Sequence, residues 1–107
     1  VLQREDVGAV TAIWDRAALV ALPEELRARY ARALMTLAPG ATMLLVTFVH
    51  DFAGGPPFSV SDDEVRALYA GCEVELIDMQ DGVPSATLQA KGMKKLDEHV
   101  FRIVFPK

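Results

Sequence analysis

Two adjacent charged residues, Asp15 and Arg16, follow directly on an apolar run from Val7 to Trp14. An apolar run of this length is typical of a β-strand that is buried on both faces. In open α/β sheets, ligands bind at the carboxyl edge of the strands, which is where these residues would lie. The Arg16 guanidinium could bind an anionic or heteroaromatic group with its planar set of donors. The Asp15 carboxylate could bind a cationic amine or orient Arg16, or it could be only an ion-pair partner or helix cap.

Aromatic and proline side chains near these residues are further candidates for binding. Trp14 could stack on an adenine or another purine, or it could be a half-buried aromatic residue at the end of the strand. The segment Gly54-Gly55-Pro56-Pro57-Phe58 predicts a stiff loop, because two prolines fix an extended backbone and the glycines before them permit positive φ. Pro56, Pro57 and Phe58 could form an apolar wall, or the segment could be an ordinary tight connection.

The histidines and the cysteine offer less chemistry. His50 ends the second apolar run and could accept a proton there, although a surface or capping role is the simpler interpretation. His99 has no partner at the spacing of metal ligands, so no metal site is predicted. Cys72 is the only cysteine, which excludes an intramolecular disulfide and a zinc site built from cysteines.

Four apolar runs predict the β-strands that would position these side chains. They are Val7 to Trp14, Ala41 to His50, Val74 to Met79 and Val100 to Phe105. Right-handed crossovers would make the first strands parallel. Residues 85–92 form the least periodic segment, so no helix is predicted between the last two strands, and these are expected to form an antiparallel hairpin.

Two helices are predicted between the first three strands. One begins at Pro23, which fits the first turn and precedes two acids that complement the helix dipole, and it ends before Gly40. Its apolar side is predicted to consist of Leu26, Tyr30, Ala33, Leu34 and Leu37, and its polar side of Arg27, Arg29 and Arg32. The second helix begins with the capping box of Ser61 and Glu64 and ends at Gly71.

Two of these motifs resemble the thiopurine S-methyltransferase family, particularly its bacterial members. They are Trp14-Asp15-Arg16-Ala17-Ala18-Leu19-Val20-Ala21-Leu22-Pro23 and Gly55-Pro56-Pro57-Phe58-Ser59-Val60. The resemblance runs from about Asp6 to Phe105 and corresponds to the C-terminal half of the family's fold. It implies an α/β fold in which residues 1–107 form one domain. This domain would be a partial Rossmann-like methyltransferase sheet in the order β-α-β-α-β-β, with the last strand antiparallel and the first strands of the full fold missing.

The resemblance also implies roles for the candidate residues. Enzymes of this family transfer a methyl group from S-adenosylmethionine to a thiol or another soft nucleophile. Asp15 and Arg16 would border the substrate cavity, the loop of Pro56, Pro57 and Phe58 would line it, and Trp14 and Arg16 would contact the cofactor. The glycine-rich cofactor loop would precede Val1, so this chain alone is expected to bind S-adenosylmethionine weakly or not at all.

The composition limits the choice of partners. Hydrophobic residues make up 51% of the chain, charged residues 24%, and the formal net charge is −4. No clustered basic surface is predicted, which argues against nucleic acid, and no apolar stretch is long enough to span a membrane. We expect a cytoplasmic homodimer, joined through the strand from Val7 to Trp14 or by exchange of an element, or a complex with an N-terminal half supplied in trans. The alternative is a non-catalytic remnant that associates with itself or binds another molecule.

Overall fold

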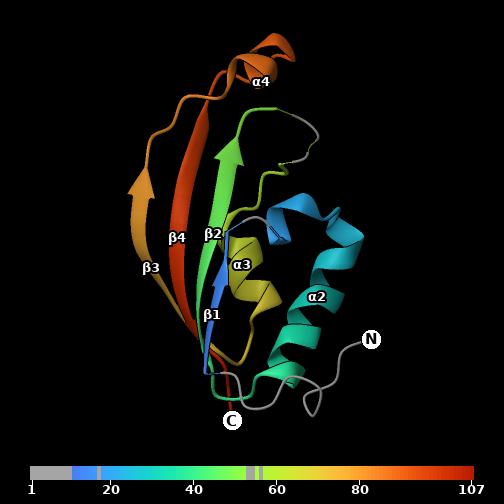
Figure 1. Cartoon of the computed structure of the whole chain (residues 1–107), viewed down its shortest axis with the longest axis vertical. Coiled ribbons are helices and arrows are strands. Elements are labelled where there is room, and N and C mark those ends of the chain that lie inside the picture. The colour runs from blue at the N-terminus through green and yellow to red at the C-terminus, as the bar shows by residue number, and fades with distance from the viewer. Residues whose placement is uncertain (1–10, 17, 53–54, 56) are drawn as a thin grey trace.

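The computed structural model describes residues 11–16, 18–52, 55 and 57–107 (Figure 1). In this part of the chain, the strands are β1 (Ala12–Asp15), β2 (Thr42–His50), β3 (Glu73–Gln80) and β4 (Leu96–Val104). The helices are the 3-10 helix η1 (Leu19–Ala21), α2 (Glu24–Leu37), α3 (Asp62–Leu68) and α4 (Ala86–Ala90). The predicted mixed α/β fold is confirmed, and the predicted strands β2 and β3 lie within one residue of their observed bounds.

The four strands form one sheet in the order β1-β2-β4-β3. β1 and β2 are parallel, whereas β4 is antiparallel to both of its neighbours, β2 and β3. The predicted antiparallel pairing of the last two strands is therefore confirmed. In addition, β4 lies between β2 and β3, and β1 is one edge of the described sheet.

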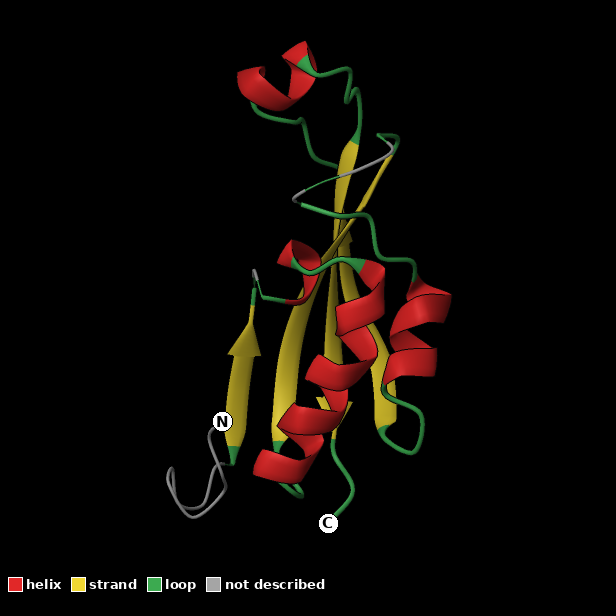
Figure 2. Ribbon diagram, turned by 90° about the vertical axis from the view of Figure 1, so that its right-hand side faces the viewer, coloured by secondary structure: helices red, strands yellow, loops and turns green. Residues whose placement is uncertain are grey.

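One face of the sheet packs against α2 and α3 (Figure 2). The side chains that alternate toward this face form the hydrophobic core, in which Tyr69 stacks on Phe105 with ring centroids 5.9 Å apart. The buried strand residues of this core include Met43, Leu45, Phe101 and Ile103. No described helix covers the other face of the sheet, and the carboxyl ends of β1 and β2 lie at the same edge (Figures 1 and 2).

The predicted buried side of α2 is right for Tyr30 and Leu34, which pack against the core, and wrong at other positions. Leu26 and Ala33 are exposed, whereas Arg27 and Ala31 are buried. Arg27 is only 5% exposed because its guanidinium forms an ion pair with Glu64 of α3, 2.7 Å long, and its Nε donates to the Leu22 carbonyl. Arg27, which was predicted on the polar side of the helix, is therefore a buried cation with two partners.

The other differences concern element boundaries. The prediction of no helix within residues 85–92 is wrong, since the five-residue helix α4 lies there, and β4 begins four residues earlier than predicted. The first strand was predicted from Val7, and residues 7–10 of that prediction lie outside the described residues. In the described part of the chain, no helix is long and apolar enough to cross a membrane.

Candidate functional site

Asp15, the last residue of β1, turns its side chain into the molecule. Its Oδ1 accepts hydrogen bonds from the backbone N–H groups of Ala18 (3.0 Å) and Leu19 (3.4 Å), which begin η1. Its Oδ2 accepts a hydrogen bond of 2.7 Å from the hydroxyl of Tyr30 on α2. The side chain is only 4% exposed. Of the roles considered from the sequence, the geometry matches the helix cap, because both carboxylate oxygens already have partners.

Two tyrosines lie close to this carboxylate. Burial, with the hydrogen bond to Asp15 second, raises the pKa of Tyr30 far above its usual range. Burial, with the negative charge of Asp15 second, also raises the pKa of Tyr69. The Tyr69 hydroxyl is buried and has no hydrogen-bond partner in the structure described, so it differs from Tyr30 in contributing no hydrogen bond to the site.

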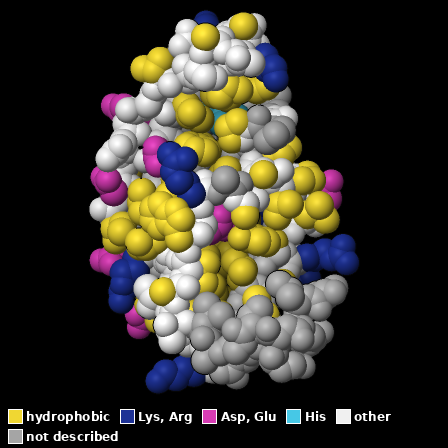
Figure 3. All heavy atoms as spheres, in the orientation of Figure 1, with side chains coloured by type: hydrophobic (Ala, Val, Ile, Leu, Met, Phe, Trp, Pro, Cys, Tyr) yellow, Lys and Arg dark blue, Asp and Glu magenta, His cyan; other side chains and the backbone are white. Residues whose placement is uncertain are grey.

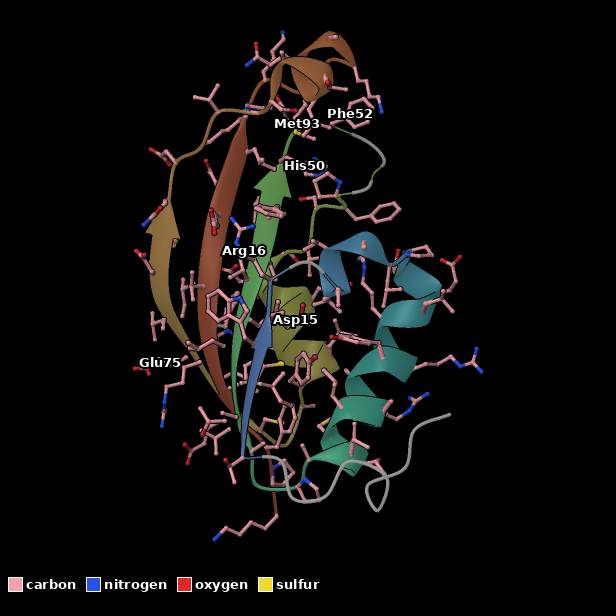
Figure 4. All side chains as sticks on the ribbon, in the orientation of Figure 1. Asp15, Arg16, His50, Phe52, Glu75 and Met93 are labelled. Atoms are coloured by element: carbon pink, nitrogen blue, oxygen red, sulfur yellow. The ribbon has the colours of Figure 1, made fainter. Side chains whose placement is uncertain are left out.

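Arg16 leaves β1 on the opposite side from Asp15 (Figure 4). Its side chain is exposed, and no ion pair to another described residue holds it. Trp14 lies on the same side of the strand, because side chains two positions apart share a face, and it is 61% exposed. The structure thus separates the two charged candidates: the Asp15 carboxylate is fixed in the interior, and the Arg16 side chain is exposed.

Trp14 belongs to a row of side chains on the uncovered face of the sheet. In the strand register, Trp14 pairs with Leu44, Leu44 with Arg102, and Arg102 with Glu75. The row on the helix-covered face is the adjacent one, which includes the buried residues Met43 and Ile103. Apolar side chains form a band down the middle of the molecular surface in the view of Figure 3. Trp14 therefore lies beside Leu44 on the uncovered face, in a row that also contains the charged residues Arg102 and Glu75.

His50 forms hydrogen bonds with the loop that follows β2. Its Nε2 lies 2.7 Å from the Pro57 carbonyl oxygen, and its Nδ1 accepts a hydrogen bond of 3.2 Å from the Phe52 N–H. Because Nδ1 accepts, the proton of the neutral ring is on Nε2, which donates to Pro57. The Ser59 hydroxyl oxygen accepts the backbone N–H of His50 at 3.1 Å. His50 is therefore a structural contact of the loop, which agrees with the simpler interpretation of the sequence.

The same loop is joined to the end of β1 through η1. The Phe58 N–H donates to the carbonyl of Val20 at 2.7 Å, and Val20 lies in the helix that Asp15 caps. Phe58 is half-buried, and the Arg27 guanidinium carbon lies 5.5 Å from its ring centroid. Pro57 is half-buried, whereas Pro56 lies outside the described residues. Two of the predicted regions, the end of β1 and the loop at Pro57 and Phe58, are thus linked by one backbone hydrogen bond.

Tyr30 and Arg27, which position this region, were not among the candidate residues predicted from the sequence. Tyr30 was assigned to an apolar helix side, and its hydroxyl was the only signal that it could donate a hydrogen bond to an interior acid. Arg27 was assigned to solvent, and no local signal in the sequence pointed to its ion pair with Glu64 of another helix.

The described glycines with positive φ do not lie where a nucleotide-like cofactor is usually cradled. Gly40, Gly71 and Gly92 have positive φ, and each follows a helix and precedes a strand. In a cofactor cradle, glycine follows the carboxyl end of a strand and precedes a helix, so that the backbone approaches the ligand closely. Nor do three metal-ligating side chains gather at one place among the residues described. These residues can position a ligand from one side, and they do not by themselves fit a whole cofactor.

Comparison with known proteins gives a consistent match. Residues 1–104 match the family model described as Thiopurine S-methyltransferase (TPMT). A thiopurine S-methyltransferase of Pseudomonas putida (strain W619) is 44% identical over 108 residues, which cover 97% of this chain and 50% of that protein. One of Xanthobacter autotrophicus (strain ATCC BAA-1158 / Py2) is 47% identical over 103 residues, covering 94% and 46% respectively. The chain spans about half the length of the curated relatives it matches.

Proposed function

The chain belongs to the thiopurine S-methyltransferase family, and from that premise we propose that it forms the substrate-side half of such a methyltransferase. The observation that carries the proposal is the arrangement at the end of β1. The exposed Arg16, with no described ion pair, directly follows Asp15, whose carboxylate is fixed by three hydrogen bonds on the other side of the strand. A group that holds a ligand works best when its neighbours hold the backbone still.

S-adenosylmethionine, the cofactor of this class of enzyme, supplies the methyl group when it is bound. Methyl transfer from a sulfonium requires little acid or base, and depends on an aligned nucleophile and the exclusion of water. In this proposal, Arg16 binds an anionic or heteroaromatic acceptor or the cofactor's carboxylate, and Trp14 stacks on an adenine or purine ring. Pro56, Pro57 and Phe58 form the apolar wall, and Asp15 holds the backbone from which Arg16 extends.

The proposal assigns cofactor binding to a second polypeptide region. The described glycines with positive φ all follow helices, and we infer that this chain alone does not hold S-adenosylmethionine. The missing cradle would come from an N-terminal half, in the same polypeptide or in trans. We propose a cytoplasmic location, which cell fractionation can test.

The decisive experiment is complementation. The N-terminal half of the Pseudomonas putida relative is expressed separately, mixed with this chain, and assayed for methylation of a thiopurine. We expect methylated product only when both halves are present. Catalysis by this chain alone would contradict the assignment of the cofactor site to another region. A stable complex of the two halves that methylates no thiopurine would overturn the proposed substrate class.

We also propose that the isolated chain associates with itself through β1, which is the alternative to an enzyme half. β1 is an edge strand whose only charged side chain, Asp15, is turned inward, and Trp14 is exposed beside it. The opposite edge, β3, carries exposed Glu73, Glu75 and Asp78 and a β-bulge, features that discourage pairing of edges. Two β1 edges can pair about a two-fold axis without opposing like charges. Exchange of an element between chains would give a dimer that does not depend on this edge.

A further inference from the structure

Residues 83–95 form an arm that extends beyond the end of the sheet and carries α4 (Figures 1 and 2). The arm has its own local architecture. The Ser85 hydroxyl caps α4 by accepting the Leu88 N–H at 3.3 Å. After the helix, Gly92 adopts a φ of 105°, and the N–H groups of Gly92 and Met93 donate to the carbonyls of Gln89 and Leu88. These two bonds form a Schellman motif, which reverses the chain toward the sheet.

The arm joins the sheet at a narrow neck. Its two ends meet where Gly82 follows β3 and Leu96 begins β4, and a Cβ atom at Gly82 would collide with the Leu96 carbonyl oxygen. Only glycine permits this close approach of the two backbones. A compact loop of this length whose ends lie close together is an Ω-type loop, a class that is frequently functional.

Beyond the neck, hydrogen bonds to Asp51 join the arm to the body of the protein. Oδ1 of Asp51, the residue after β2, accepts the backbone N–H groups of Lys94 (3.0 Å) and Lys95 (3.3 Å). The preceding residue, Met93, is 1% exposed and lies near His50 and Phe52 (Figure 4). In contrast, most residues of α4 are exposed. Of the residues in the arm, Met93 and Pro84 are buried, and one carboxylate, that of Asp51, binds two of its amides.

We propose that this arm is a hinged cover at the carboxyl edge of the sheet, and that Asp51 is the positioning residue that holds it closed. A segment held by solvent-exposed hydrogen bonds and few buried side chains opens at a lower free-energy cost than the sheet. Loops that close over an active site have this low local stability. On the proposed function, the closed arm borders the side of the site from which the methyl acceptor enters.

Limited proteolysis tests the cover without any requirement for activity. Trypsin cleaves after Lys91, Lys94 and Lys95 in the arm and after Arg29 and Arg32 in α2, so each digestion contains its own reference sites. In the Asp51→Ala variant we expect cleavage in the arm to become about fivefold faster, as for loss of an exposed charge-assisted hydrogen bond, with cleavage in α2 unchanged. Asp51→Asn retains an accepting oxygen without the charge and should give an intermediate rate.

Asp81→Ala is the matched control, because it removes a carboxylate that acts on Lys95 only through its charge. It should leave cleavage in the arm close to the rate of the parent protein. Three results would overturn the proposal: equal rates in Asp51→Ala and the parent, equal acceleration in Asp81→Ala, or equal acceleration at the α2 sites. Amide exchange of Lys94 and Lys95 should show the same order of variants.

The role of the arm at the acceptor side rests on the proposed function, and kinetics test it separately from the attachment of the arm. In a complemented enzyme, Asp51→Ala should raise the KM for the acceptor severalfold with a smaller effect on kcat. An unchanged KM, together with faster cleavage of the arm, would refute its role at the acceptor side. A complemented enzyme without any activity would refute the proposed function, while the proteolysis result would still decide whether Asp51 holds the arm.

Discussion

Replacement of Tyr30 by phenylalanine isolates the hydrogen bond that holds Asp15. The bond is short, 2.7 Å, and its acceptor is a carboxylate that is 4% exposed. Hydrogen bonds to charged groups typically contribute about 1.5–3 kcal/mol, so Tyr30→Phe should lower the free energy of unfolding by about 2 kcal/mol. For a domain of this size, that loss corresponds to a decrease in Tm of roughly 10 °C. Urea and thermal unfolding followed by circular dichroism measure both quantities.

Tyr69→Phe is the matched control, since it makes the same chemical change in the same core. The Tyr69 hydroxyl is buried and has no partner among the described residues, so its removal should leave stability unchanged or raise it slightly. If Tyr30→Phe were as stable as the parent protein, the hydrogen bond to Asp15 would contribute nothing. If both variants lost the same stability, the loss would come from ring packing, and the reasoning about Asp15 would be refuted.

Four other predictions concern ligands, association and pH. Calorimetric titration of the isolated chain with S-adenosylhomocysteine should show no binding at micromolar strength, and micromolar binding would mean that a cofactor site is rebuilt. In a complemented enzyme, Arg16→Ala should lower turnover about ten- to a hundredfold. His50→Ala removes only contacts within the loop and should mainly raise the KM for the acceptor. Equal effects of the two variants on turnover would show that Arg16 is not part of the site. If the chain forms the proposed homodimer through β1, Trp14→Lys should convert it into a monomer by light scattering after size exclusion. Met79→Lys, equally exposed at 61% on β3, should not, and a dimer that survives Trp14→Lys would place the contact elsewhere. The N–H groups of Lys94 and Lys95 hold the pKa of Asp51 below its usual range, and the positive charge of Lys94 lowers it further, while Lys95 interacts mainly with Asp97 and Asp81. The amides of the arm should therefore stay protected from exchange at neutral pH and lose protection only as the pH falls through that lowered pKa. Constant protection down to about pH 2 would show that the Asp51 carboxylate does not hold the arm.

The sequence was sufficient for the elements whose signals are local. Strand β2 was predicted from its apolar run, α2 from Pro23 and the acids after it, and α3 from its capping box, in which Ser61 does accept the Glu64 N–H. The buried side of α2 could not be predicted, because it depends on the ion pair of Arg27 with a residue on another helix. A hydrophobic pattern counts apolar side chains, and it does not register a cation whose partner is distant in the sequence.

The candidate site shows the same division. The position of Asp15 at the end of a strand followed from the apolar run before it, whereas the choice between cap and ligand depended on Tyr30, which belongs to the next helix. Similarly, α4 lacks helical periodicity because it packs few side chains, and the attachment of its arm depends on Asp51, far away in the sequence. Local patterns thus located the site, and contacts between distant elements determined what each residue does in it.

The insertion of β4 between β2 and β3 has a consequence for synthesis and folding. β3 pairs only with β4 among the described strands, so neither strand that flanks β4 has its full set of partners until the last strand has been made. During translation, the inner edge of β2 and the whole of β3 would remain open while the arm emerges. Pairing between strands so distant in the chain is also slow. A chain that stopped shortly before Leu96 would keep the pair of β1 and β2 and would leave β3 without a partner among the described strands.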